Sequence, residues 1–336
     1  MSHKLATFAV VLGLTALTSC RPDGLSYSSD TSSTPGSNQQ LDAAPKVNAL
    51  TSMPLMMQWE FYSHEKDGSM EHLIERFYAD GTGQSSLELL AIGDGITAPV
   101  PPAVDVAMLH DSRQIFLALY RNLSVTNADM VSDNYTWFET HGTHVIAGQN
   151  CTKYLLDSKF NIGDAELWID DNTDVILAWT LFDPKGHELQ SLSATNVSYS
   201  PDLNSVNWAV PPVASQPYDP WTSNDQLGFR PHRLVYAGPG FDSKKQSMLL
   251  SQSLFPSVKN IHLNMLTDGL RTVFVAQQMP PEWAVQPKGH RMGSVSHARV
   301  GGVSVLEGLV SERWVFCVGS LEFQDLLLIA NALRKG

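Results

Sequence analysis

Cysteine is scarce in this chain: 336 residues contain three, at positions 20, 151 and 317. So few cysteines exclude a small fold held together by several disulfides. Basic residues are also in the minority, and the formal net charge of −12 argues against a nucleic-acid partner. After the first 20 residues no apolar run is long enough to span a bilayer. Hydrophobic residues make up 43% of the whole chain, which is enough to form ordinary hydrophobic cores.

Catalytic motifs are missing as well. The sequence contains no Gly-x-Ser-x-Gly elbow, phosphate-binding loop with its lysine, His-Glu-x-x-His pair or dinucleotide-binding glycine pattern. His141 and His144 are the nearest approach to a metal pair, but residues three apart in a strand point to opposite faces. We therefore expect no catalytic residue, no metal site and no cofactor, and interpret the chain as a protein that is not an enzyme.

The first 20 residues have the pattern of an export signal. Lys4 precedes an apolar run from Leu5 to Leu17, which has the length of a signal-peptide core. Leu17-Thr18-Ser19-Cys20 resembles the bacterial lipobox, in which the cysteine thiol accepts the lipid. The alternative is an ordinary secretory signal that contains a cysteine. The pattern predicts a periplasmic protein anchored through lipidated Cys20, and Arg21 at the next position favours the outer membrane.

Composition divides the rest of the chain. Residues 21–47 are rich in Ser, Asp, Gln, Pro and Gly and indicate a flexible tether. Residues 48–213 and 227–336 are the expected globular domains, and the Pro-rich stretch 214–226 is the expected linker. The first domain holds 7 Lys and Arg against 22 Asp and Glu, a net charge of −15, and the second holds 12 against 7, a net charge of +5. The opposite charges favour docking between the two domains, and the basic domain suits an acidic partner. Alternatively, the charged residues of each domain form an ordinary solvated surface.

The first domain is dominated by strand signals. Short apolar and aromatic runs alternate with turn residues, such as Asp80-Gly81-Thr82-Gly83. Residues 104–122 carry apolar side chains at helical spacing and predict a helix. The expected strands are 56–63, 73–79, 85–90, 144–147, 151–157, 165–169, 175–182 and 189–199.

The second domain repeats this alternation and ends in a helix. Asp268-Gly269 and Gly301-Gly302 lie between pairs of strand candidates as hairpin turns. A closing helix is expected over 321–333, with Ser320 as its N-cap. Many consecutive strands with few helices predict an α+β fold, in its simplest form a curved antiparallel sheet covered by a helix. The expected strands are 233–237, 261–266, 272–277, 295–300, 303–307 and 313–318.

Large aromatic side chains gather on the strands of the first domain. On a curved sheet they could line a cavity for an acyl chain, or they could form a packed core. Cys151 and Cys317 are the only cysteines after position 20, and they form either one disulfide or two buried free thiols. The candidate cavity residues are Trp59, Phe61, Phe77, Trp168, Trp179 and Phe182.

Several hairpin motifs, in this order, resemble a known family. The strand Val145–Cys151, then Leu167-Trp168-Ile169-Asp170, then the hairpin over Phe182–Leu189 resemble the LolA-like lipoprotein-binding fold. Residues 263–277, Val300-Gly301-Gly302-Val303 and residues 313–319 with the final helix are similar to the C-terminal domain of the RseB/MucB family. The resemblance covers roughly residues 50–336.

The resemblance implies a half-barrel that binds the acyl chain of a lipid or lipoprotein, and a smaller domain that contacts the periplasmic domain of an anti-sigma factor. Members of this family regulate the envelope stress response through that contact. Typical members are soluble in the periplasm, whereas this chain carries Cys20. The lipid anchor favours an alternative hypothesis, a LolB-like acceptor of outer-membrane lipoproteins, although LolB has no second domain. A purely structural surface lipoprotein is a third hypothesis.

Overall fold

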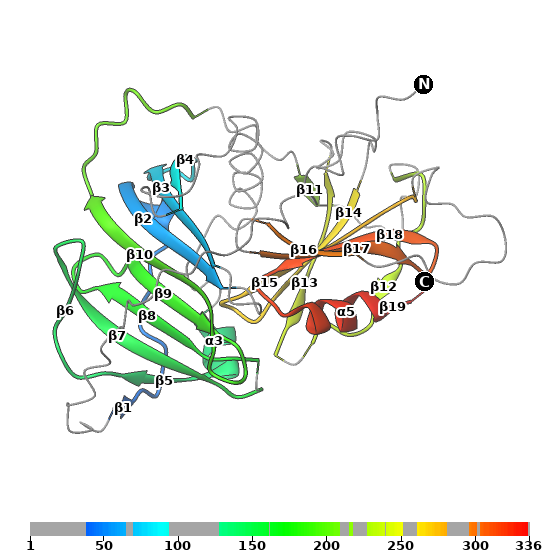
Figure 1. The fold of residues 1–336 in the computed structure, drawn as a ribbon, viewed down its shortest axis with the longest axis horizontal. Coiled ribbons are helices and arrows are strands. Elements are labelled where there is room, and N and C mark those ends of the chain that lie inside the picture. The colour runs from blue at the N-terminus through cyan, green and yellow to red at the C-terminus, as the bar shows by residue number, and fades with distance from the viewer. Residues whose placement is uncertain are drawn as a thin grey trace. The chain divides into compact units, whose positions relative to one another are not determined.

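The structure is a computed structural model that describes residues 38–64, 70–93, 128–160, 162–208, 215–217, 227–238, 240–250, 261–280, 296–300 and 303–334. Within these ranges the fold is rich in antiparallel sheet (Figure 1). The expected signal peptide with Cys20, most of the expected tether and the expected helix over 104–122 lie outside the described residues. None of the helices that the structure describes is long and apolar enough to cross a membrane.

The first sheet contains ten strands in the described part of the chain, in the order β1-β5-β7-β8-β9-β10-β2-β3-β4, with β6 paired to β7. The sheet is open, since β1 and β4 lie at its edges. The pairing of β10 with β2 joins its two halves across a long sequence separation. The strands are β1 Gln39–Gln40, β2 Pro54–His64, β3 Met70–Asp80, β4 Ser85–Ile92, β5 Tyr135–Glu139, β6 His144–Ile146, β7 Gln149–Ser158, β8 Ala165–Asp170, β9 Ile176–Phe182 and β10 Glu188–Ser198.

Among the described residues the second sheet has seven strands, in the order β11-β13-β14-β15-β18-β17-β16, and a separate pair joins β12 to β19. Helix α5 contacts β17 and β18, and its buried Leu326 and Ile329 belong to the same apolar cluster as Val315. The elements are β11 Ser215–Pro217, β12 Arg233–Leu234, β13 Asp242–Leu250, β14 Ile261–Thr267, β15 Thr272–Gln278, β16 Ser296–Val300, β17 Val303–Val310, β18 Arg313–Gly319, α5 Phe323–Asn331 and β19 Leu333–Arg334.

Side-chain alternation explains why these segments are strands. In β2 every second residue from Leu55 to Ser63 is buried and the residues between them are partly exposed. This period of two matches a strand with one face against a core. In β15 all seven residues are buried, which fits the centre of a sheet packed on both faces.

The hairpin turn that the sequence predicts at residues 80–83 is present, whereas the predicted turn at 301–302 lies outside the described residues. Asp80 accepts hydrogen bonds from the backbone N–H groups of Thr82 (2.7 Å) and Gln84 (3.0 Å), and this fixes the β3–β4 hairpin. Gly81 has a φ of +79°, and a Cβ there would lie 2.8 Å from Cδ of Pro54. A glycine is therefore required by both the backbone conformation and the close approach of Pro54.

Several boundaries differ from the sequence interpretation. The last helix begins at Phe323, its N-cap is Glu322 and no side chain caps it, so Ser320 as the N-cap was wrong. Ser215–Pro217 lies in the expected linker but pairs with β13. Helix α3 (Ala128–Asn134), β5 and β13 are among the elements that were not expected.

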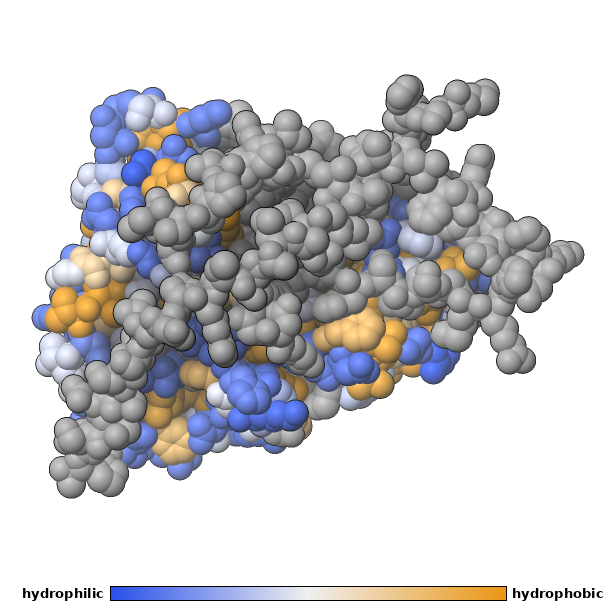
Figure 2. All heavy atoms as spheres, in the orientation of Figure 1, coloured by the Kyte–Doolittle hydropathy of each residue, from blue (hydrophilic) through white to orange (hydrophobic). Residues whose placement is uncertain are grey.

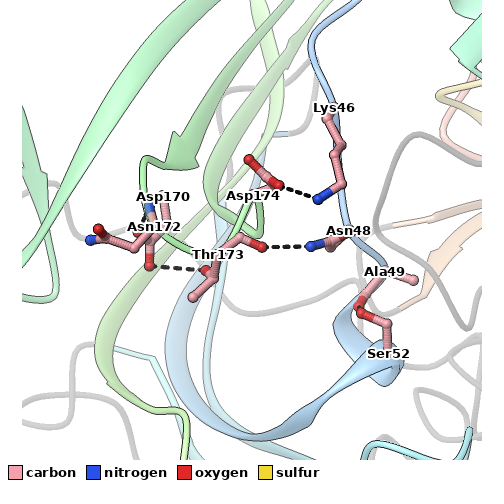
Figure 3. Close-up of polar contacts among 8 residues, drawn as sticks. All are labelled: Lys46, Asn48, Ala49, Ser52, Asp170, Asn172, Thr173 and Asp174. Carbon is pink, nitrogen blue, oxygen red and sulfur yellow. Dashed lines mark hydrogen bonds and ion pairs between the residues drawn. The ribbon is translucent and has the colours of Figure 1, made fainter.

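The folded part also extends back into the expected tether. Lys46 and Asp174 form an ion pair at 2.6 Å, and the side chain of Asn48 donates to the carbonyl of Thr173 at 2.8 Å (Figure 3). The carboxylate of Asp170 organises the same turn by accepting from the backbone N–H of Asn172 at 2.8 Å. Residues 38–47 therefore lie along the first sheet instead of forming free chain.

Candidate functional site

Four of the six candidate cavity residues lie together on one face of the first sheet. Trp59 stacks on Phe77 with ring centroids 5.5 Å apart, and Phe61 meets Trp179 edge to face at 6.2 Å. All four are at least 93% buried. We call this side of the sheet the aromatic face and define it by Trp59, Phe61, Phe77 and Trp179.

The other two candidates do not belong to that group. In the β8–β9 register Leu167 is opposite Trp179, so the next residue, Trp168, points to the opposite face. There the Nζ atom of Lys153 lies 4.8 Å from the centroid of the Trp168 ring. Phe182 is three residues after Trp179 in the same strand and also points to the opposite face. The sequence alone could not assign the side chains of Trp168 and Phe182 to a face of the sheet.

The aromatic face contains one buried acid. Glu75 is fully buried, and its Oε2 accepts a hydrogen bond from Nε1 of Trp59 at 2.8 Å. Because Glu75 and Trp59 are opposite each other in the β2–β3 register, this contact fixes the orientation of the indole ring. The rest of the buried lining of β2 on this face is apolar up to Phe61.

A second polar cluster joins the two sheets. The turn between β14 and β15 carries Asp268, which is fully buried. Its Oδ2 accepts from the hydroxyl of Tyr135 in β5 at 2.7 Å, and its Oδ1 accepts from the backbone N–H groups of Leu270 and Arg271 at 2.9 and 2.6 Å. Asn134 donates its side-chain amide to the carbonyl of Asp268 at 2.8 Å. We call Asn134, Tyr135, Asp268 and Arg271 the junction.

Arg271 extends the junction toward the first sheet. Its guanidinium donates to the carbonyls of Ile162 and Gly163, the latter at 2.7 Å, and to that of Phe182 at 3.1 Å. A Cβ on Gly163 would lie 2.0 Å from the oxygen of Phe182, so only glycine fits beneath the guanidinium. A charged group that is 98% buried is stabilised here by backbone carbonyls and by the Asp268 carboxylate.

Burial is the largest influence on the titratable groups of the junction. Burial raises the pKa of the Asp268 carboxyl, although Arg271 and the Tyr135 hydroxyl act in the opposite direction. Burial also raises the pKa of Tyr135 well above 10. Tyr135 is thus a hydrogen-bond donor at neutral pH, and the junction is a structural link. Among the described residues no group of three or more His, Cys, Asp or Glu side chains is placed to hold a metal ion.

Cys151 and Cys317 are both buried free thiols. Cys151 lies in β7 of the first sheet and Cys317 in β18 of the second. Of the two alternatives that the sequence left open, the structure has the free thiols and no disulfide between these residues.

The large exposed apolar side chains of the described residues are scattered. On the side drawn in Figure 2, orange residues form several separate groups among blue ones. The large exposed apolar side chains come from unconnected elements, for example Val145 in β6 and Leu328 in α5. Scattered apolar residues of this kind are ordinary on a protein surface.

Removal of the Tyr135 hydroxyl tests the junction. We expect Tyr135→Phe to lower the free energy of unfolding by about 1–3 kcal/mol, since it leaves a buried carboxylate without one of its donors. The matched control is Tyr62→Phe, whose hydroxyl bonds Glu60 at a partly exposed position and whose loss should cost below about 1 kcal/mol. Urea unfolding measures both, and equal effects would contradict the importance of the junction.

Thiol titration tests the two cysteines. Burial raises the pKa of Cys151 to about 11 and that of Cys317 to about 12, so both should resist alkylation at pH 8 in the native protein. In denaturant without reductant both should react at once. Peptide mapping by mass spectrometry assigns the modified sites, and alkylation that appears only after reduction would indicate a disulfide.

No protein-family model and no curated protein matches this chain. Among solved structures it is similar to MucB in complex with MucA(peri), with 14% identity, coverage of 85% of this chain and 94% of that chain, and a TM-score of 0.47. The Pseudomonas aeruginosa MucA/MucB complex matches with 14% identity, coverage of 84% and 93%, and a TM-score of 0.47. MucB alone matches with 14% identity, coverage of 86% and 94%, and the same TM-score. MucB, from the family that the sequence motifs resemble, is thus a structural neighbour of this chain.

Proposed function

We propose that this chain is a non-catalytic binding protein of the bacterial envelope, anchored through Cys20, whose first sheet binds an acyl chain and which also contacts a protein partner. The observation that carries the proposal is the aromatic face, where four large aromatic side chains from β2, β3 and β9 belong to one buried cluster. Rigid apolar side chains on one side of a sheet provide the contact area that a chain of methylene groups requires.

The polar interactions of the described residues support a binding role over catalysis. The most deeply buried charges, Asp268 and Arg271, use their hydrogen bonds on backbone groups and on Tyr135. Glu75 bonds an indole N–H. Each of these groups therefore holds structure, and none is paired with a nucleophile in the way that acid–base catalysis requires.

The partner is proposed from the motifs and the charge of the second segment. The hairpin series and closing helix resemble the C-terminal domain of the RseB/MucB family, which implies the periplasmic domain of an anti-sigma factor as partner. Residues 227–336 carry a net charge of +5, which favours an acidic partner surface. In this role the protein regulates an envelope stress response, and a bound acyl chain signals the stress.

Organic extraction tests the ligand. We expect the full chain, purified from the envelope, to release non-covalent acyl lipid on extraction, detected by mass spectrometry, while lipid bound to Cys20 stays attached. Phe61→Ala should lower the extracted lipid about tenfold, because the ligand loses the contact with a buried ring.

The matched control for this extraction is Trp168→Ala, which removes an aromatic ring from the opposite face and should leave the lipid content unchanged. Phe61→Leu retains most of the volume and separates lost binding from lost folding, which circular dichroism reports. A wild-type protein without extractable lipid would overturn the ligand part of the proposal.

Partner capture separates regulation from lipoprotein transport. We expect the full chain to retain the periplasmic domain of an anti-sigma factor in a pull-down, with retention that falls as salt screens the basic segment. A LolB-like acceptor instead takes radiolabelled lipoprotein from a carrier and retains no anti-sigma domain. Transfer without retention would therefore replace the regulatory proposal by its alternative.

A further inference from the structure

Three polar side chains on the aromatic face have buried polar atoms without a partner in the described part of the chain. They are Oγ of Ser63, Nε2 of Gln190 and Nε1 of Trp179. The exposed fractions of these residues are 1%, 3% and 7%. A buried polar group without a hydrogen bond destabilises a fold, and a cluster of such groups calls for an explanation.

The strand register brings the three together. Gln190 in β10 is directly opposite Ser63 in β2, and the next pair on the same face is Leu192 with Phe61. On its other side Leu192 is opposite Trp179 in β9. Directly opposite residues have Cβ atoms about 5 Å apart, and diagonal neighbours at about 7–8 Å are within reach of an indole ring. The three polar side chains therefore lie in two adjacent rows of cross-strand neighbours on β2, β10 and β9.

The donors determine what the cluster can bind. An indole N–H and an amide N–H can only donate, and a hydroxyl can donate or accept. The cluster thus suits an acceptor oxygen. The buried residues of β2, β9 and β10 on this face include no Lys or Arg, and the neighbouring strand β3 carries the buried acid Glu75. A neutral carbonyl oxygen fits this setting better than an anion.

We propose that Ser63, Gln190 and Trp179 form a polar subsite for the ester carbonyl of the acyl ligand, with the chain itself lying against the aromatic rings. The inference rests on the proposed function and adds to it the group by which the ligand is oriented. The ester comes from a phospholipid or from the diacylglyceryl group of a lipoprotein, and the chemistry that the subsite reads is the same in both.

Ester and ether analogues test the subsite. The delipidated full chain is titrated with a diester phosphatidylglycerol and with its diether analogue of equal chain length, which lacks the carbonyl oxygens. We expect the wild type to bind the diester about tenfold more tightly, the effect of one to two hydrogen bonds. In Trp179→Phe and Gln190→Leu the preference should fall to about onefold to twofold.

The matched controls are Trp168→Phe and Gln58→Leu, which make the same replacements on the opposite face of the sheet and should retain the preference. A second pair of ligands, a diacylglyceryl-cysteine peptide and its dialkyl ether, identifies the source. Ester preference in either pair supports the subsite, and the pair with the larger preference indicates whether the ligand is a phospholipid or a lipoprotein.

The outcomes separate the two proposals. If the wild type binds ester and ether equally in both pairs, the subsite is wrong and acyl binding stands. If it binds neither class of ligand, acyl binding is wrong and the subsite falls with it. Equal loss of preference in the control variants would also overturn the subsite, because the effect would then not depend on these donors.

Stability supplies an independent readout. In the ligand-free protein, Gln190→Leu removes a buried amide whose Nε2 atom has no hydrogen-bond partner in the described residues, and we expect the Tm to rise. A residue that merely supports the fold would lower the Tm when replaced. A lower Tm for Gln190→Leu, with the control Gln58→Leu unchanged, would show that the amide is already satisfied and would overturn the subsite.

Discussion

The hydrogen bond between the buried carboxylate of Asp268 and Tyr135 is the interaction on which the junction of the two sheets depends. Asp268 lies in a hairpin turn of the second sheet and accepts the hydroxyl of Tyr135 from the first. The same turn places Arg271, whose guanidinium reaches backbone carbonyls of the first sheet. Because buried charges are costly unless they are paired or hydrogen-bonded, the Asp268 carboxylate and the two terminal nitrogens of Arg271 depend on these hydrogen bonds.

The junction also has a consequence for the proposed signal. Arg271 donates a hydrogen bond to the carbonyl of Phe182 at the end of β9. Trp179 of the aromatic face lies three residues earlier in the same strand. A ligand on the aromatic face therefore contacts a strand that is hydrogen-bonded to the second sheet.

Period-two alternation determined how much of the fold could be predicted. In β2, β3, β8 and β10 the apolar and turn residues identify strand and hairpin within a few positions, because each strand packs one face against a core. The elements α3, β5 and β13 were missed. β5 is five residues long, and β13 carries the polar run Asp242-Ser243-Lys244-Lys245, so neither offers a clear period. The ends of the tether and linker were misplaced since their polar residues join sheets by backbone bonds, which leave no compositional signal.

The sequence by itself predicted an export signal with Cys20 and determined the absence of known catalytic motifs, the strand-rich fold and the residue types on the sheets. Only the tertiary structure decided which aromatic side chains share a face, that Cys151 and Cys317 are free thiols in different sheets, and that Asp268 meets Tyr135. It also brought Ser63 opposite Gln190. The reason is physical: composition and periodicity act over a few residues, whereas register and burial are set by pairing between strands far apart in the chain.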